Sequence, residues 1–139
     1  MTRLRALSPY LLVGLLGGAG ALHLVRPATF EALIPPFLPA PRLWVYGSGV
    51  VELLCAAAVA LPRTRGRGAL ASAVLLVAVL PGNIQMAVDP GGVPRWIALA
   101  RLPLQLPLVM WALQVRRQSR TRSARVARPS STSGPIRCS

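Results

Sequence analysis

Four long apolar stretches recur along the chain, separated by short polar segments. They cover residues 7–25, 43–61, 69–88 and 96–115. A helix rises 1.5 Å per residue, so about 20 apolar residues cross the roughly 30 Å of hydrocarbon in a bilayer. None of the four stretches alternates with the period of two that a membrane β-barrel strand requires. The pattern therefore predicts an all-α protein, a bundle of four transmembrane helices over these ranges.

A proline-rich segment separates the first two stretches. Pro27 suits the first position of a short helix, and the pair Pro35-Pro36 must end such a helix. Phe30 and Leu33 fall on one side of it at helical spacing. We expect a short amphipathic segment that lies on the outer end of the bundle as a lid. A stiff connector that only dips into the lipid headgroups is the alternative.

The distribution of arginine predicts how the helices are oriented. The net charge is +13, and all 16 basic residues are arginine. Three arginines lie between the second and third stretches and seven follow Val115, whereas the opposite side holds only Arg26, Arg42 and Arg95. By the positive-inside rule the protein is a multi-pass protein of the cell membrane with both termini in the cytoplasm. Alternatively, the first stretch is a cleaved signal peptide, with Arg3 and Arg5 as its basic start.

Composition divides the chain into a membrane domain, residues 1–115, and a tail, residues 116–139. The tail is rich in Arg, Ser and Pro and has almost nothing to bury, so we expect it to be disordered. Anionic lipid headgroups are its expected partner, beside the lipid bilayer that surrounds the helices. No nucleic acid is expected as a partner, because the tail lacks the aromatic side chains on which bases stack.

Polar residues interrupt the apolar stretches at only a few places. An acid at the depth of Glu52 is costly in lipid and needs a partner, and Arg101 is the only basic residue inside any stretch. Counted from the outer ends, His23 lies roughly 3 Å deep, Arg101 and Asn83 roughly 7 Å, and Glu52 and Gln105 roughly 13 Å. We therefore predict a buried polar centre in the outer half of the bilayer, formed by Glu52, Arg101, Asn83, Gln105, His23 and Ser48.

Three interpretations of this centre stay open. It is a structural ion pair with amide groups that hold the helices together, a pocket for a small amphipathic ligand such as a quinone, or a path for protons or a solute. The residues indicate no metal site, and a single histidine argues against haem. They identify no catalytic residue, so whether the protein is an enzyme stays open.

The same residues resemble a known family, the DoxX-like small bacterial membrane proteins. The matching segments, in chain order, are Gly20-Ala21-Leu22-His23 with Pro27 and Phe30, Ile34-Pro35-Pro36 with Leu38-Pro39, Ser48-Gly49-Val50-Val51-Glu52, Pro81-Gly82-Asn83-Ile84-Gln85-Met86, and Arg101-Leu102-Pro103-Leu104-Gln105 with Trp111. Two positions depart from the family pattern: Leu24, where relatives more often carry Phe, and Gly82, which replaces a usual Ala. Neither departure removes a polar group.

The resemblance implies a four-helix bundle in the bacterial inner membrane with both ends cytoplasmic. The family is named after a subunit of a sulfur-oxidising, quinone-reducing enzyme, so a quinone is the candidate cofactor and a redox protein the candidate partner. On this basis we expect a quinone-associated accessory subunit. A non-catalytic scaffold or assembly factor is the first alternative, and a small-solute transporter is the second.

Overall fold

The computed structural model describes residues 2–89 and 94–126 of the chain. These residues form helices only, with no strand among them. The helices are α1 (Thr2–Val25), α2 (Pro27–Glu31), α3 (Pro41–Ala60), α4 (Arg65–Ala78), α5 (Leu80–Val88) and α6 (Arg95–Val126).

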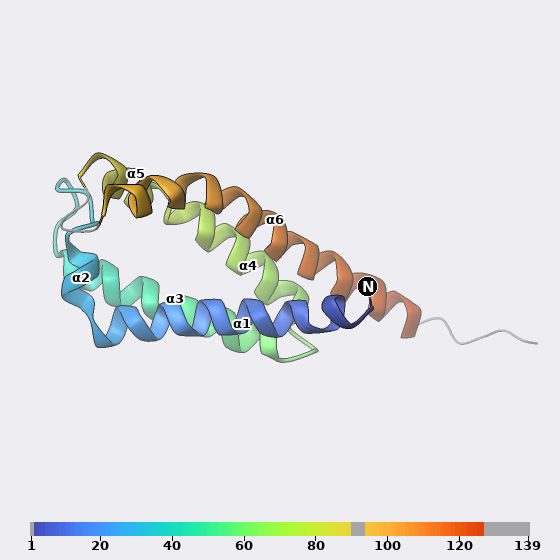
Figure 1. Cartoon of the computed structure of the whole chain (residues 1–139). Helices are drawn as coiled ribbons and strands as arrows, with labels where there is room; N and C mark the ends of the chain where they lie inside the picture. Colours follow the sequence, from blue (N-terminus) through green and yellow to red (C-terminus); the bar gives the residue numbers. More distant parts are fainter. Residues whose placement is uncertain (1, 90–93, 127–139) are drawn as a thin grey trace, which may run out of the picture.

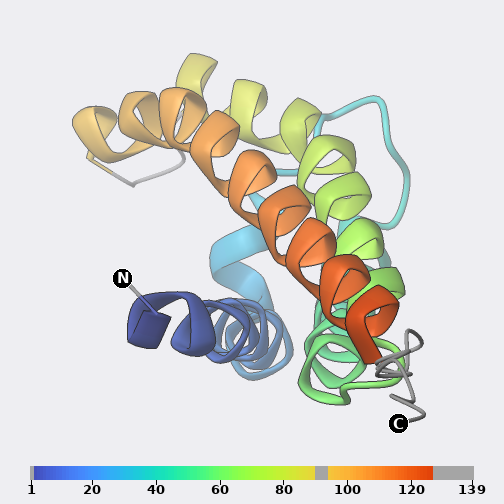
Figure 2. The ribbon, with the colours of Figure 1, turned by 90° about the vertical axis from the view of Figure 1, so that its right-hand side faces the viewer.

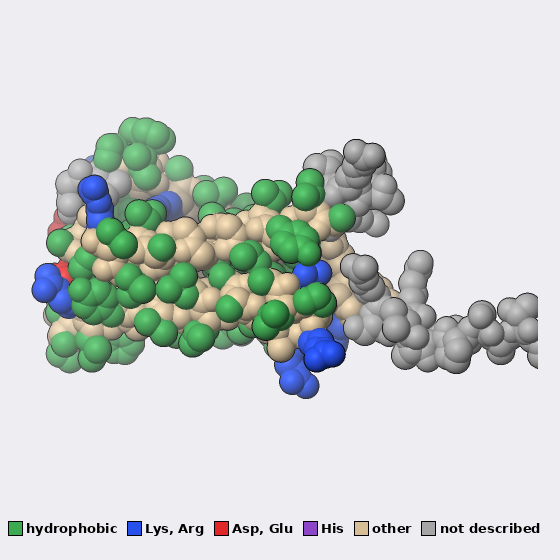
Figure 3. Space-filling model, turned by 90° about the horizontal axis from the view of Figure 1, so that it is seen from below, with side chains coloured by type: hydrophobic (Ala, Val, Ile, Leu, Met, Phe, Trp, Pro, Cys, Tyr) green, Lys and Arg blue, Asp and Glu red, His purple; other side chains and the backbone are tan. Residues whose placement is uncertain are grey.

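The described helices give four segments that are long and apolar enough to cross a membrane. They are Ala6–Val25, Pro41–Ala60, Arg65–Val88 and Arg95–Thr121. Figure 3 shows apolar side chains along the length of one face, with arginines gathered near its two ends. This is the surface that a bilayer requires, because hydrocarbon accepts apolar groups while charged groups stay at the interfaces. The predicted four-helix membrane fold is confirmed, and the protein is an integral membrane protein.

The helices are arranged as two packed pairs (Figure 1). Helix α1 runs along α3, and α6 runs along the α4–α5 segment. We call the end of the bundle that holds α2 the α2 end, and the opposite end, where α4 begins and α6 finishes, the tail end. Figures 1 and 2 show that the two pairs lie close together toward the tail end and diverge toward the α2 end.

Each end of the bundle has its own apolar core. The larger one, toward the tail end, joins all four crossing segments and contains Leu12, Leu16, Cys55, Ala56, Val59, Ala69, Ala73, Ala112 and Val115. Many of its members are alanine, so the backbones can approach closely, as is usual between membrane helices. The smaller core at the α2 end contains Leu33, Met86 and Ala98, with Phe30 packed against it. The segment around α2 therefore bridges the two pairs where they diverge, which is the position expected of a lid.

The third crossing segment differs from the prediction of one continuous helix, because it is broken at Val79 into α4 and α5. Pro81 lies in the first turn of α5. A proline has no N–H to donate to the carbonyl four residues earlier, and its ring clashes with that carbonyl. A proline in an apolar stretch implies a missing backbone donor, but it does not by itself predict that the helix divides there.

The fourth crossing segment is longer than predicted. Helix α6 was expected to end at Val115 and to be followed by disorder, but it continues to Val126. Residues 116–126 contain no proline or glycine, and Arg and Gln are good helix formers that can extend an existing helix even without apolar burial. The rest of the predicted disordered tail, residues 127–139, lies outside the described residues.

The turn between α3 and α4 closes the end of α3 with side chains. Thr64 Oγ1 donates a hydrogen bond to Ala58 O at 2.8 Å. Arg65 donates from Nε to Val59 O at 2.9 Å and from its terminal nitrogen to Ala60 O at 3.1 Å. The Arg65 guanidinium also lies over the ring of Tyr10 in α1, 5.3 Å from its centroid. These contacts satisfy carbonyls that a helix C-terminus leaves without partners, and they place a positive charge where the helix dipole favours it.

Candidate functional site

The candidate site begins with a close contact between two glycines, Gly20 in α1 and Gly49 in α3. A Cβ atom added to Gly20 would lie 2.7 Å from the carbonyl oxygen of Gly49 and 3.1 Å from Cβ of Glu52. A Cβ atom added to Gly49 would lie 2.8 Å from Cβ of His23 and 3.1 Å from the carbonyl oxygen of Gly20. Gly20 thus faces Glu52, which lies three residues after Gly49. Gly49 in turn faces His23, which lies three residues after Gly20. Only residues without a side chain allow the antiparallel helices to approach this closely.

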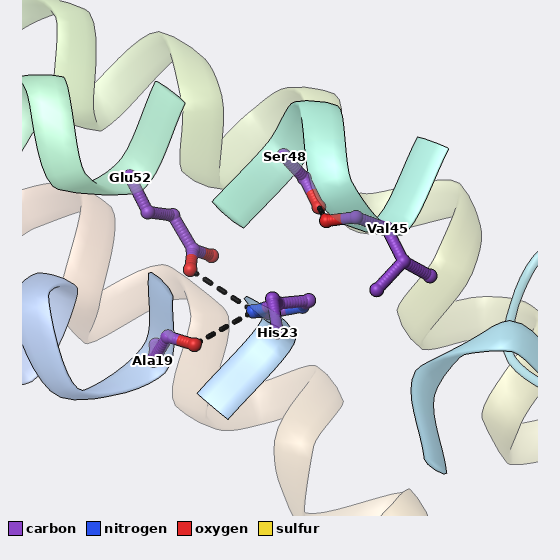
Figure 4. A network of polar contacts seen from close by, with 5 residues as sticks. All are labelled: Ala19, His23, Val45, Ser48 and Glu52. Atoms are coloured by element: carbon purple, nitrogen blue, oxygen red, sulfur yellow. Dashed lines mark hydrogen bonds and ion pairs between the residues drawn. The ribbon is translucent and has the colours of Figure 1, made fainter. Parts of the chain in front are cut away.

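This contact brings His23 and Glu52 face to face (Figure 4). His23 Nδ1 lies 3.1 Å from Glu52 Oε2, and the two side chains are only 17% and 11% exposed. The same nitrogen lies 2.8 Å from the carbonyl oxygen of Ala19. A carbonyl oxygen can only accept, so Nδ1 must carry a proton and donate it there. The pair is an ion pair when the ring is also protonated at Nε2.

Glu52 Oε2 has an acceptor capacity that the described protein groups do not use. The oxygen is buried, and no donor in the described part of the chain makes an aligned hydrogen bond to it. The 3.1 Å approach of His23 is close enough for an ion pair, but the hydrogen on Nδ1 is directed at Ala19. Buried carboxylate oxygens without hydrogen bonds are rare because desolvation is costly. The oxygen can therefore accept one further hydrogen bond.

An aromatic ring covers the imidazole. Phe30 in α2 stacks on His23, with ring centroids 4.0 Å apart and an angle of 28° between the planes. The same ring packs on the core of Leu33, Met86 and Ala98 at the α2 end. An ion pair between Arg42 Nε and Glu31 Oε1, 2.6 Å long, fastens α2 to the start of α3. The site is therefore closed on one side by the α2 segment.

The predicted partner of Glu52 was wrong. Glu52 pairs with His23, whereas Arg101 is exposed and forms no ion pair within the described residues. The reason lies in the helix arrangement, because α3 packs on α1 and α4, and α6 runs along α4 and α5 instead (Figure 1). Ser48 also stays apart from the pair, since its hydroxyl donates to Val45 O of its own helix at 2.9 Å.

Asn83 and Gln105 form a second polar cluster in the other helix pair. Asn83 Nδ2 donates to Gln105 Oε1 at 3.0 Å, and Gln105 Nε2 donates to the carbonyl oxygen of Leu76. Leu76 lies just before the break that Pro81 causes between α4 and α5. The amide of Gln105 thus donates to a carbonyl next to that of Val77, which Pro81 leaves without its helical donor, and side-chain donors near such a break are one way in which membrane helices tolerate proline. Among the described residues no hydrogen bond or ion pair joins this cluster to His23 and Glu52.

The six predicted residues therefore do not form one centre. His23 and Glu52 form an acid–base pair under Phe30, and Asn83 and Gln105 bond beside the kink. Ser48 bonds within its own helix, and Arg101 makes no ion pair within the described residues, although its charge acts on His23. Sequence reasoning missed the role of Phe30 beside His23. For the pairing of His23 with Glu52, the signal available in the sequence was the shared spacing Gly20-x-x-His23 and Gly49-x-x-Glu52. No three His, Cys, Asp or Glu side chains among the residues described come together as metal ligands.

Most of the chain matches the model of a protein family. Residues 12–116 match the model of a domain of unknown function, DUF8561. The matched range contains α2, α3, α4, α5 and both polar clusters, together with most of the first and fourth crossing segments. No curated protein and no solved structure matches the chain.

Proposed function

Because this chain belongs to the DUF8561 family, whose description gives no activity, we propose a function from its residues and from its resemblance to the DoxX-like proteins. The proposed protein is a DoxX-type accessory subunit in the cell membrane, with both termini in the cytoplasm. In this proposal His23 and Glu52 bind the head group of a small amphipathic redox molecule, a quinone or quinol. Electron transfer would take place on a partner redox protein.

The unused acceptor capacity of Glu52 Oε2 is the observation that carries this proposal. A quinol hydroxyl donates a hydrogen bond, so it supplies the donor that this buried oxygen does not find among the described residues. A quinone carbonyl accepts a hydrogen bond, and a protonated Nε2 of His23 is a suitable donor. The pair therefore has one partner for each redox form of the head group.

The surroundings of the pair suit an aromatic ligand. The ring of Phe30, stacked on His23 at 4.0 Å, provides an apolar wall of the kind that quinone rings contact. The helices around it expose large apolar side chains, among them Leu22 at 53% and Val50 at 47%. A lipid-soluble molecule would approach this side of the helix pair from the bilayer.

The proposal is tested by what the purified protein retains. The full chain is purified in a mild detergent, and bound quinones are extracted and identified by mass spectrometry. We expect the Glu52→Gln variant to lose most of the quinone while it keeps its helix content. The matched control is Ser48→Ala, one turn away on the same helix, which removes a hydroxyl that donates to Val45 O within α3 and should retain the quinone.

A second pair of variants tests the apolar wall. Phe30→Ala removes the ring that stacks on His23, and we expect quinone retention to fall several-fold. Phe37→Ala removes a ring that is 78% exposed and should leave retention unchanged. Equal retention in Glu52→Gln and the unmodified protein would disprove the proposal.

The alternative with direct structural support is a non-catalytic scaffold. The pair His23–Glu52 joins α1 to α3 at the point where Gly20 and Gly49 meet, so it also contributes to helix association. In that case Glu52→Gln would reduce the amount of folded protein, and the unmodified protein would contain no quinone above the level of other membrane proteins prepared in parallel.

A further inference from the structure

A second place on the molecule has the properties of a ligand site. Helices α4 and α6 lie side by side (Figures 1 and 2), and at the tail end an open pocket of about 390 Å³ lies between them. The start of α4 comes close to α6 here, since a Cβ atom added to Gly66 would lie 2.8 Å from Ser119 Oγ. The residues lining the pocket are Pro62, Arg63, Gly66, Arg67, Leu70, Arg116, Ser119 and Arg120.

Four of these lining residues are arginines, and none is acidic. The chain has only three acidic residues, Glu31, Glu52 and Asp89, and all lie in other segments. Within the described residues no carboxylate forms an ion pair with any of the four guanidinium groups. Arg116 and Arg120 are one turn apart on the same face of α6, a spacing at which like charges repel. The pocket is thus a concentration of positive charge that an anion would stabilise.

Arg65, which lies beside these arginines in the sequence, has a different role from those that line the pocket. Arg65 lies between Arg63 and Arg67 in the sequence, but it binds the carbonyls at the end of α3 and covers Tyr10. The charges of Arg63 and Arg67 are not used in this way, and both residues line the pocket. The pocket also lies at the beginning of α4, where the helix dipole adds to the attraction for an anion.

We propose that the pocket formed by Arg63, Arg67, Arg116 and Arg120 binds the phosphate group of an anionic membrane lipid. Guanidinium groups form paired hydrogen bonds with phosphate oxygens, which makes phosphate the favoured anion. Leu70, further along α4, gives the pocket an apolar side toward the bilayer. A lipid headgroup can thus lie among the arginines while its acyl chains stay beside the helices. Basic pockets between membrane helices are known to bind lipids in this way.

The test compares lipid retention by the full chain in vesicles and nanodiscs of phosphatidylcholine with and without phosphatidylglycerol. Native mass spectrometry counts the phosphatidylglycerol molecules that stay bound after transfer to detergent. We expect the double variant R63Q/R120Q to bind phosphatidylglycerol about 30-fold more weakly, since two of the four charges are lost. The control is R95Q/R117Q, which removes the same charge from exposed arginines outside the pocket and should bind like the unmodified chain.

A second arm separates a lipid headgroup from a free phosphate. Inorganic phosphate or glycerol 3-phosphate is added to lipid-free protein in detergent, and stabilisation against heat is measured. Strong stabilisation by these ions, without enrichment of phosphatidylglycerol, would show that the pocket binds free phosphate and not a lipid headgroup. If R63Q/R120Q does not fold, R63K/R120K keeps the charge but not the paired hydrogen bonds, and we expect it to bind several-fold more weakly. Equal lipid binding by the pocket variants and the control would overturn the site itself.

Discussion

His23 Nδ1 lies 3.1 Å from Glu52 Oε2 and 2.8 Å from the carbonyl oxygen of Ala19, so one nitrogen faces two acceptors. The imidazole is fixed by its own helix through Ala19 and covered by Phe30. The carboxylate of Glu52 approaches it from the other helix of the pair. The two side chains are therefore positioned by separate elements, and the glycine contact determines the distance between them.

The first prediction concerns this pair. His23→Leu should leave the buried Glu52 carboxyl without its ion-pair partner and lower the free energy of unfolding by about 3 kcal/mol. The double variant His23→Leu/Glu52→Leu should recover much of this loss, because two apolar groups need no partner. Unfolding of the detergent-solubilised chain, measured for both single variants and the double variant, gives the coupling between the residues. A coupling near zero would contradict a direct interaction.

The second prediction concerns the glycine contact. Gly20→Ala would place a Cβ atom 2.7 Å from the backbone oxygen of Gly49, and a backbone atom cannot move aside as a side chain can. We expect α1 and α3 to separate slightly and the free energy of unfolding to fall by about 1–3 kcal/mol. Gly18→Ala is the matched control, because nothing lies within 4 Å of a Cβ atom there. Its free energy of unfolding should equal that of the unmodified chain or be slightly higher.

The third prediction concerns the broken helix. Gln105→Leu removes the donor to Leu76 O and the acceptor for Asn83 Nδ2, and we expect a loss of about 1–3 kcal/mol of stability. Combination with Pro81→Ala should restore part of it, because the alanine N–H can donate to the carbonyl oxygen of Val77, which helps α4 to continue into α5. Thermal unfolding followed by circular dichroism measures both effects. Gln114→Leu, at an exposed position on the same helix, should have little effect.

The fourth prediction concerns orientation. A reporter that is active only in the cytoplasm should be active when fused to the C-terminus of the full chain. A reporter that is active only outside the cytoplasm should be active when inserted near Ala40, between α2 and α3. The arginine distribution gives this expectation, since the tail end carries most of the basic residues. Activity of the cytoplasmic reporter at Ala40 would reverse the assignment of the two sides.

The sequence predicted the four crossing segments well because their signal is local. An apolar stretch of about 20 residues is sufficient to indicate a membrane helix, whatever its neighbours are. The packing of the α2 segment at that end could also be expected, since Phe30 and Leu33 share one side of a short helix that proline residues delimit. The break at Val79 could not be predicted from the local sequence alone, because many membrane helices contain a proline without dividing.

The partner of Glu52 could not be derived from depth alone. His23 and Arg101 both fell in the half of the bilayer that holds Glu52, but depth does not tell which helices are neighbours. Helix order is decided by packing, and the close contact is made by Gly20 with Gly49. The more familiar pattern, Gly14-x-x-x-Gly18, has no close neighbour at either glycine. Only comparison of the two helices shows that each carries a glycine three residues before a polar group.

The turn after α3 has a consequence for any attempt to invert this protein in the membrane. Arg63, Arg65 and Arg67 carry equal weight as positive charges between the second and third crossing segments. Arg65 differs from the other two because it also holds the last carbonyls of α3 and covers Tyr10 of α1. Charge-reversal designs should therefore replace Arg63 and Arg67 and leave Arg65 in place, so that a change of sidedness is not confused with unfolding.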